Sequence, residues 1–123
     1  MQLHGQELLT VSEHGEFRDI FWRGLKGMAN LQAIEIPAFA TWAMHVFRTW
    51  ETFWYQWQEG IFDENLYAGY QVQFCDLLGY AGILEVWKTR QHQFSAAFRE
   101  YTNQNIAEGN SRPLYVDQEV GDV

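Results

Sequence analysis

The chain has 123 residues, of which 47% are hydrophobic and 17% aromatic, and its 16 acidic and 8 basic side chains give a formal net charge of −8. This length suffices for one hydrophobic core, and no apolar run approaches the roughly eighteen residues that a membrane span requires. The negative charge repels phosphate backbones, which argues against binding to nucleic acid.

The N-terminal part of the chain predicts a short, frayed helix within residues 1–12 and a better-defined helix after it. Thr10 and Glu13 have the spacing of a capping box, which places the start of the second helix near them. Trp22 lies off the inner stripe of this helix and either borders the core or contacts something outside the chain. We expect the helix to end by Gly27 or Asn30 and its inner face to hold Phe17, Ile20, Phe21, Gly24, Leu25 and Met28.

A long central helix is predicted over roughly residues 37–59. Pro37 suits the first turn, and Gly60 suits the left-handed residue that closes a helix. Large apolar side chains recur there at three- and four-residue steps, on a face wide enough to pack against a core. They are Phe39, Trp42, Val46, Phe47, Trp50, Phe53, Trp54 and Trp57.

Three further helices are predicted after the central one. Asp63 is a good N-cap for a helix from residue 64 to about 78, and the short connection folds this helix back antiparallel to the central one. Its inner residues are expected to be Leu66, Tyr70, Phe74, Leu77 and Leu78. A break over 79–82 precedes an amphipathic helix with Ile83, Leu84, Trp87 and Phe94 on one side. Ser95 caps a last short helix in which Phe98 and Tyr101 or Thr102 point inward.

The sequence therefore predicts an all-α fold, a single-domain helical bundle of about four to six helices over residues 1–104. From Asn105 the helical pattern dissolves into a polar, acidic stretch with Gly and Pro. We expect residues 105–123 to form a poorly ordered tail.

Several segments resemble a family of uncharacterised bacterial proteins. They are FRDIFWRGL at 17–25, FWYQWQEGIFD at 53–63 with Glu64 and Tyr70, WKTR at 87–90 and FSAAF at 94–98. The resemblance covers roughly residues 8–103 and implies a small aromatic-rich helical domain without an established activity. Members of that family often carry an N-terminal transmembrane helix, so relatives may be membrane-tethered, whereas we expect no membrane span in this chain.

We find no pattern typical of a catalytic or metal site, and we expect neither an enzyme nor a cofactor. No Glu is followed by His at the spacing of a di-metal carboxylate bundle, and no Gly-x-Ser-x-Gly elbow occurs. Cys75 is the only cysteine, which excludes an intrachain disulfide and a cysteine-rich zinc site and favours a reducing, cytoplasmic location. We expect Cys75 to be an inert, half-buried thiol.

Glu51 lies at the edge of the apolar face of the central helix and has two interpretations. It is either a boundary carboxylate paired with Arg48 or Arg23, or the anchor for a polar or cationic ligand group in an aromatic pocket, with Tyr55 or Trp22 beside it. Surplus aromatics at stripe edges, namely Trp22, Tyr55 and Tyr67, favour a protein-interaction module that forms a homodimer. The alternative function is a sensor domain that binds a small molecule near Glu51.

Overall fold

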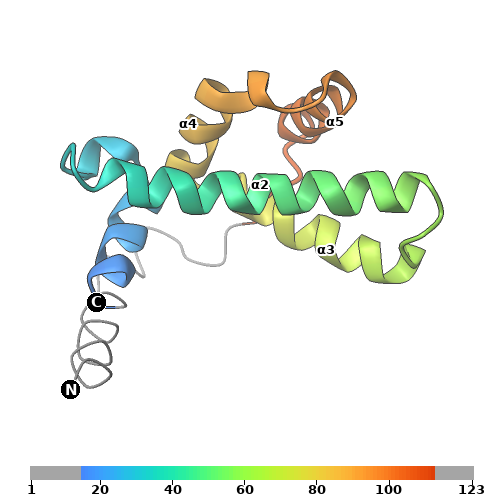
Figure 1. The fold of residues 1–123 in the computed structure, drawn as a ribbon, viewed down its shortest axis with the longest axis horizontal. Coiled ribbons are helices and arrows are strands. Elements are labelled where there is room, and N and C mark those ends of the chain that lie inside the picture. Colours follow the sequence, from blue (N-terminus) through green and yellow to red (C-terminus); the bar gives the residue numbers. More distant parts are fainter. Residues whose placement is uncertain (1–14, 113–123) are drawn as a thin grey trace, which may run out of the picture.

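A computed structural model describes residues 15–112, which consist of helices and connecting turns without a strand (Figure 1). Residues 15–26 are helical and are followed by the short 3-10 helix η1 (Met28–Asn30) and the long helix α2 (Ile36–Gln58). The remaining elements are α3 (Glu64–Leu77), α4 (Ala81–Arg90), the short η2 (Gln91–Gln93) and α5 (Ala96–Ala107). The predicted all-α class is confirmed, and the predictions for residues 1–14 lie outside the described residues.

Helix α2 runs through the whole molecule, as its periodic sequence predicts. Pro37 lies in its first turn, and Gly60 has a φ of 76° just after its end. The predicted inner face is confirmed at Phe39, Phe47 and Trp50, which are almost fully buried. Although α2 is the longest helix, neither it nor any other helix among residues 15–112 has the length and apolar composition to cross a membrane.

Helix α3 returns along α2, so the two helices form a hairpin (Figure 1). The Asp63 carboxylate accepts hydrogen bonds from the backbone N–H groups of Asn65 and Leu66, which confirms the predicted N-cap. The predicted inner face of α3 was wrong at its start, because Leu66 is 56% exposed and Tyr67 is buried. The indole N–H of Trp50 donates to the Tyr67 hydroxyl at 3.1 Å, and burying Tyr67 gives that donor its partner.

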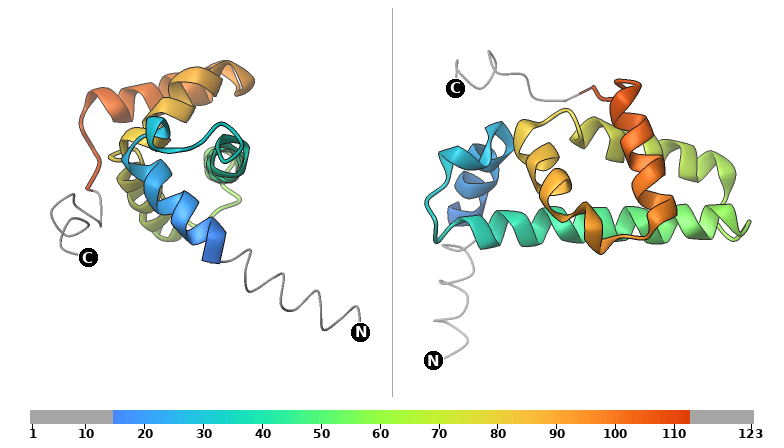
Figure 2. Two further views of the ribbon diagram at one scale, coloured as in Figure 1. Left: turned by 90° about the vertical axis from the view of Figure 1, so that its left-hand side faces the viewer. Right: turned by 90° about the horizontal axis from the view of Figure 1, so that it is seen from above.

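Helices α4 and α5 pack on one side of the α2–α3 hairpin and complete the core (Figure 2). The ring of Trp87 lies 4.9 Å from that of Phe47, and Phe98 meets Trp50 edge to face at 5.4 Å. Ser95 caps α5 as predicted, since its Oγ accepts a hydrogen bond from the Phe98 N–H. The break expected over 79–82 is shorter than predicted, because Gly82 lies inside α4 and is buried.

The last helix also extends beyond the predicted domain boundary. We expected a tail from Asn105 onward, but α5 continues through Ala107 and Asn105 is buried. The Asn105 side chain donates to the carbonyl of Tyr101 and accepts from Asn110, so a polar residue is satisfied inside the fold. The order expected for the rest of the tail, residues 113–123, lies outside the described residues.

Candidate functional site

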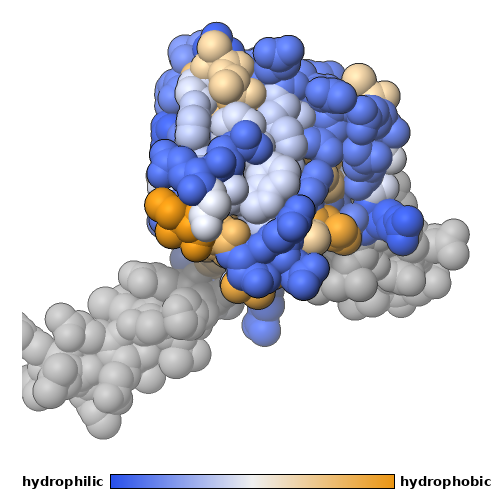
Figure 3. Space-filling view, turned by 90° about the vertical axis from the view of Figure 1, so that its right-hand side faces the viewer, coloured by the Kyte–Doolittle hydropathy of each residue, from blue (hydrophilic) through white to orange (hydrophobic). Residues whose placement is uncertain are grey.

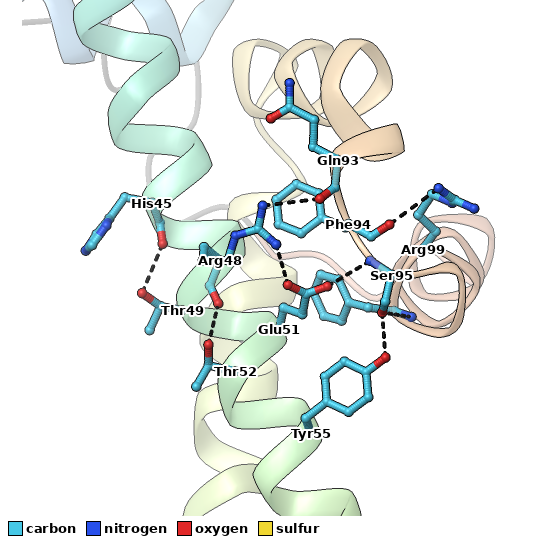
Figure 4. Close-up of polar contacts among 11 residues, drawn as sticks. His45, Arg48, Thr49, Glu51, Thr52, Tyr55, Gln93, Phe94, Ser95 and Arg99 are labelled. Atoms are coloured by element: carbon cyan, nitrogen blue, oxygen red, sulfur yellow. Dashed lines mark hydrogen bonds and ion pairs between the residues drawn. The ribbon is translucent and has the colours of Figure 1, made fainter.

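Glu51 lies at the centre of a polar cluster that connects α2 to the start of α5 (Figure 4). One carboxylate oxygen accepts a hydrogen bond from Arg48, one turn earlier on α2, and the other accepts from the backbone N–H of Ser95 at 2.9 Å. The predicted pairing of Glu51 with Arg48 is therefore observed. Because both oxygens hold parts of the fold together, we assign this carboxylate a structural role.

The neighbours of Glu51 on α2 also contact the segment just before α5. The Arg48 guanidinium lies over the ring of Phe94 at 4.2 Å and donates to the carbonyl of Gln93. The Tyr55 hydroxyl donates to Ser95 Oγ at 2.7 Å (Figure 4). Tyr55 and Glu51 thus both bind Ser95, and the Tyr55 hydroxyl is engaged by the cap of α5.

Arg23 and Trp22 lie at the other end of α2 and do not join Glu51 in one site, which corrects that prediction. Arg23 donates to both carboxylate oxygens of Glu35, each at 2.8 Å, and also to Asp19. Glu51 is about 24 Å farther along α2, at 1.5 Å per residue. Trp22 is half-buried and packs against the hydrophobic core.

The ion pair at Glu35 joins the helix of residues 15–26 to the start of α2. The hydrogen bond from Arg23, together with one from the Gln32 N–H, lowers the pKa of Glu35 to about 2. The same contacts with Glu35 and Asp19 raise the pKa of Arg23 above its ordinary value. This pair is therefore a polar link between the first helix and α2, beside the apolar contacts of the core.

An apolar groove, which the sequence analysis did not identify, opens between residues 15–26, α2 and α3. Its volume is about 460 Å³. The rings of Phe21 and Trp42 form one wall and meet edge to face at 4.6 Å. Its lining consists of Phe21, Leu25, Trp42, Val46, Gln73, Phe74, Asp76, Leu77 and Tyr80. One of these side chains is charged, so the groove suits an apolar occupant.

The groove continues into an uncharged surface of the α2–α3 hairpin, which we call the hairpin face. Each helix contributes four residues at three- and four-residue steps, so that each set lies on one side of its helix. The eight residues are Trp42, Val46, Thr49 and Phe53 of α2, and Leu66, Tyr70, Gln73 and Leu77 of α3. Leu66 and Gln73 are exposed and the other six are half-buried. Phe53 and Tyr70 join the two rows, with their rings 5.0 Å apart.

The nucleophilic and phenolic groups of the core are buried and belong to the packing. Burial raises the pKa of the Cys75 thiol to about 11, and this side chain is 3% exposed. The hydroxyls of Tyr67 and Tyr101 lie 3.0 Å apart, and burial raises the pKa of both. Among residues 15–112, no three His, Cys, Asp or Glu side chains are placed to hold a metal ion.

Comparisons of the chain with protein-family models, with curated proteins and with solved structures found no match. The resemblance to the bacterial family therefore stays a prediction.

Proposed function

We propose that this chain is a non-catalytic interaction module that self-associates as a homodimer through the hairpin face. The observation that supports the proposal is the absence of charge from these eight positions in a chain of net charge −8. Two copies of an acidic protein repel each other wherever their carboxylates meet. They approach at lowest cost where that charge is missing and apolar side chains gain from burial.

The composition of the hairpin face fits a dimer with two-fold symmetry. Such an interface uses the same patch on both copies, so aromatic rings from each copy meet their equivalents. Trp42, Phe53 and Tyr70 are half-buried, so part of each aromatic ring is still accessible to a second copy. Eight residues are fewer than the roughly 20–30 a side of stable complexes. We therefore expect a weak, concentration-dependent dimer.

The end of the hairpin is a poorer interaction surface than the hairpin face. Ile61, in the connection between α2 and α3, is 70% exposed. Figure 3, which faces this end of the molecule, shows hydrophobic surface in small separate areas among hydrophilic ones. Isolated exposed apolar residues are common on monomeric proteins and need no partner.

Sedimentation velocity over a range of protein concentrations tests the dimer. Leu66→Glu places a charge on the hairpin face, and we expect it to abolish the concentration-dependent increase of the sedimentation coefficient. Val72→Glu is the matched control, because Val72 is 58% exposed on the same helix but is turned about 120° away from Leu66. A wild-type chain that stays monomeric at every accessible concentration would contradict the proposal.

The second candidate function is a sensor domain that binds a small molecule. We propose that this molecule binds in the groove and not near Glu51. The volume of about 460 Å³ lies within the range of small-molecule sites, and the lining is aromatic and aliphatic with few polar groups. Asp76 and Gln73 favour an apolar ligand with one hydrogen-bond donor. A metabolite that raises the melting temperature of the wild type, but not of Leu77→Asp, would support this function.

A further inference from the structure

We propose that residues 114–116 of this same chain occupy the groove. The path of the chain after α5 leads to its rim. Gly109 turns the backbone with a φ of 67°, and the Asn110 side chain binds back to Asn105 and Glu108. The Arg112 backbone N–H then donates to Asp76 Oδ1 at 2.9 Å, and Asp76 lines the groove.

We call the hydrogen bond from the Arg112 N–H to Asp76 the anchor. The residues that follow it are apolar, as the lining of the groove is. Pro113 is followed by Leu114, Tyr115 and Val116, and the acidic stretch DQEVGDV comes next. Pro113 disfavours helical backbone at Arg112 and favours an extended conformation of that residue. At about 3.3–3.6 Å per residue, a fully extended chain carries these three residues no farther than roughly 14 Å from Arg112. Leu114, Tyr115 and Val116 form the first apolar run after Arg112 in the sequence.

The anchor also supplies a thermodynamic reason for docking within one molecule. A segment tethered so closely has an effective concentration on the order of millimolar, so a weak intrinsic affinity suffices to fill the groove. Trp42, Val46, Gln73 and Leu77 belong both to the groove and to the hairpin face. A docked segment therefore competes with a second copy of the chain, a consequence that rests on the proposed function.

Limited proteolysis of the full chain tests the docking. Chymotrypsin cleaves after Tyr115 when that segment is free, and cleavage of a rapidly opening segment follows the population of its open form. We expect the bond after Tyr115 to be cut at least about tenfold more slowly in the folded chain than in a synthetic peptide of residues 110–123. Equal rates would overturn the inference.

Two tail variants locate the contact without disturbing the helices. Leu114→Asp is expected to raise the cleavage rate to that of a peptide with the same substitution. Val120→Asp, which places the same charge outside the apolar run, is expected to leave the protection unchanged. Protection that Leu114→Asp does not remove would contradict docking by this segment. Leu77→Asp adds a test from the groove side, with helical circular dichroism as the check on folding.

Protein concentration separates docking within one chain from exchange between two chains. The protection is expected to be the same in dilute and concentrated solution, and protection only at high concentration would overturn docking in the same chain. Sedimentation of Leu114→Asp then tests the competition, with a stronger dimer than the wild type expected. If the bond after Tyr115 is protected but the wild type and Leu114→Asp are both monomeric, the homodimer alone is refuted. If that bond is unprotected but the dimer forms, the docking alone is refuted.

Discussion

Gly82 of α4 packs directly against Gly24 of the first helix, so closely that a β-carbon at position 82 would overlap the Gly24 carbonyl oxygen. A β-carbon at position 24 would in turn overlap the ring of Phe39 on α2. Gly82 thus lets α4 meet the backbone of the first helix directly, and Gly24 leaves the room that the Phe39 ring of α2 occupies. Phe21 and Leu25, which line the groove, belong to the helix positioned by this contact.

Substitution Gly82→Ala is expected to destabilise the fold. Overpacking a core costs about 1–3 kcal/mol, and the obstacle here is backbone, which moves less readily than a side chain. Gly69→Ala is the matched control, because Gly69 lies within α3 and a β-carbon there meets nothing within 4 Å. That control is expected to stabilise by about 0.4–1 kcal/mol. Urea unfolding measures the free energy of unfolding of both variants. A Gly82→Ala variant as stable as the wild type would contradict the close approach of Gly82 to Gly24.

The sequence predicted best those features that depend on neighbouring residues. Gly60, Asp63 and Ser95 end or cap helices as expected, because capping is settled within one turn of the chain. The inner face of α3 was predicted wrongly at its start, because Leu66 and Tyr67 are adjacent and either side chain could face the core. The choice between them depends on Trp50, whose indole N–H needs the Tyr67 hydroxyl.

The groove was missed for a similar reason. Its walls come from three segments far apart in the sequence, and periodicity within one segment cannot show that they enclose a hollow. The grouping of Glu51 with Arg23 was wrong because both border aromatic residues in the sequence, whereas the fold places Arg23 beside Glu35. Asn105 was assigned to a tail because its hydrogen-bond partners, Tyr101 and Asn110, cannot be recognised from composition.

The Arg23–Glu35 pair predicts an acid-dependent contribution to stability. The folded-state pKa of Glu35 is about 2, below its ordinary value of 4.5, so the folded state favours the charged form. The contribution is fully present above about pH 4.5 and is lost as the pH falls toward 2. We expect Glu35→Gln to lower the melting temperature at pH 7 and to lose most of that difference near pH 2.

The control for this experiment is Glu100→Gln, at an exposed position of α5. Its melting temperature is expected to follow that of the wild type over the same pH range. A Glu35→Gln deficit that stays constant from pH 7 down to pH 2 would show that the charge of Glu35 is not the cause.

The Glu51 cluster predicts a loss of stability when its carboxylate is neutralised. In Glu51→Gln, one of the two donors, Arg48 or the Ser95 N–H, meets an amide NH₂ group instead of an oxygen. Leaving a buried donor without an acceptor costs about 1–3 kcal/mol, and because both of these contacts are only partly buried we expect a loss near the lower end, about 1 kcal/mol. Glu59→Gln is the matched control, because it neutralises an exposed carboxylate at the end of the same helix and is expected to stay within about 0.5 kcal/mol of the wild type. Equal unfolding free energies for the two variants would refute the structural role of Glu51.

The Cys75 thiol is expected to react slowly with a disulfide reagent such as DTNB. Burial raises its pKa to about 11, so about one thiol in a thousand is ionised at pH 8, compared with about one in four for a free cysteine of pKa 8.5. We expect the folded chain to react at least about 100-fold more slowly than the urea-unfolded chain, because the thiolate is the reacting species.

A relocated cysteine controls for the reagent and separates burial from sequence context. The double variant Cys75→Ser, Ala68→Cys places the thiol at an exposed position of α3, where we expect it to react in the folded state as fast as in urea. For the native Cys75, the rate is expected to rise about tenfold for each pH unit between 8 and 10, as the thiolate fraction does below its pKa. Rapid labelling of native Cys75 at pH 8 would mean that the contact between α2 and α3 opens far more often than its packing implies, since that side chain lies in the core beside Tyr67 and Tyr101.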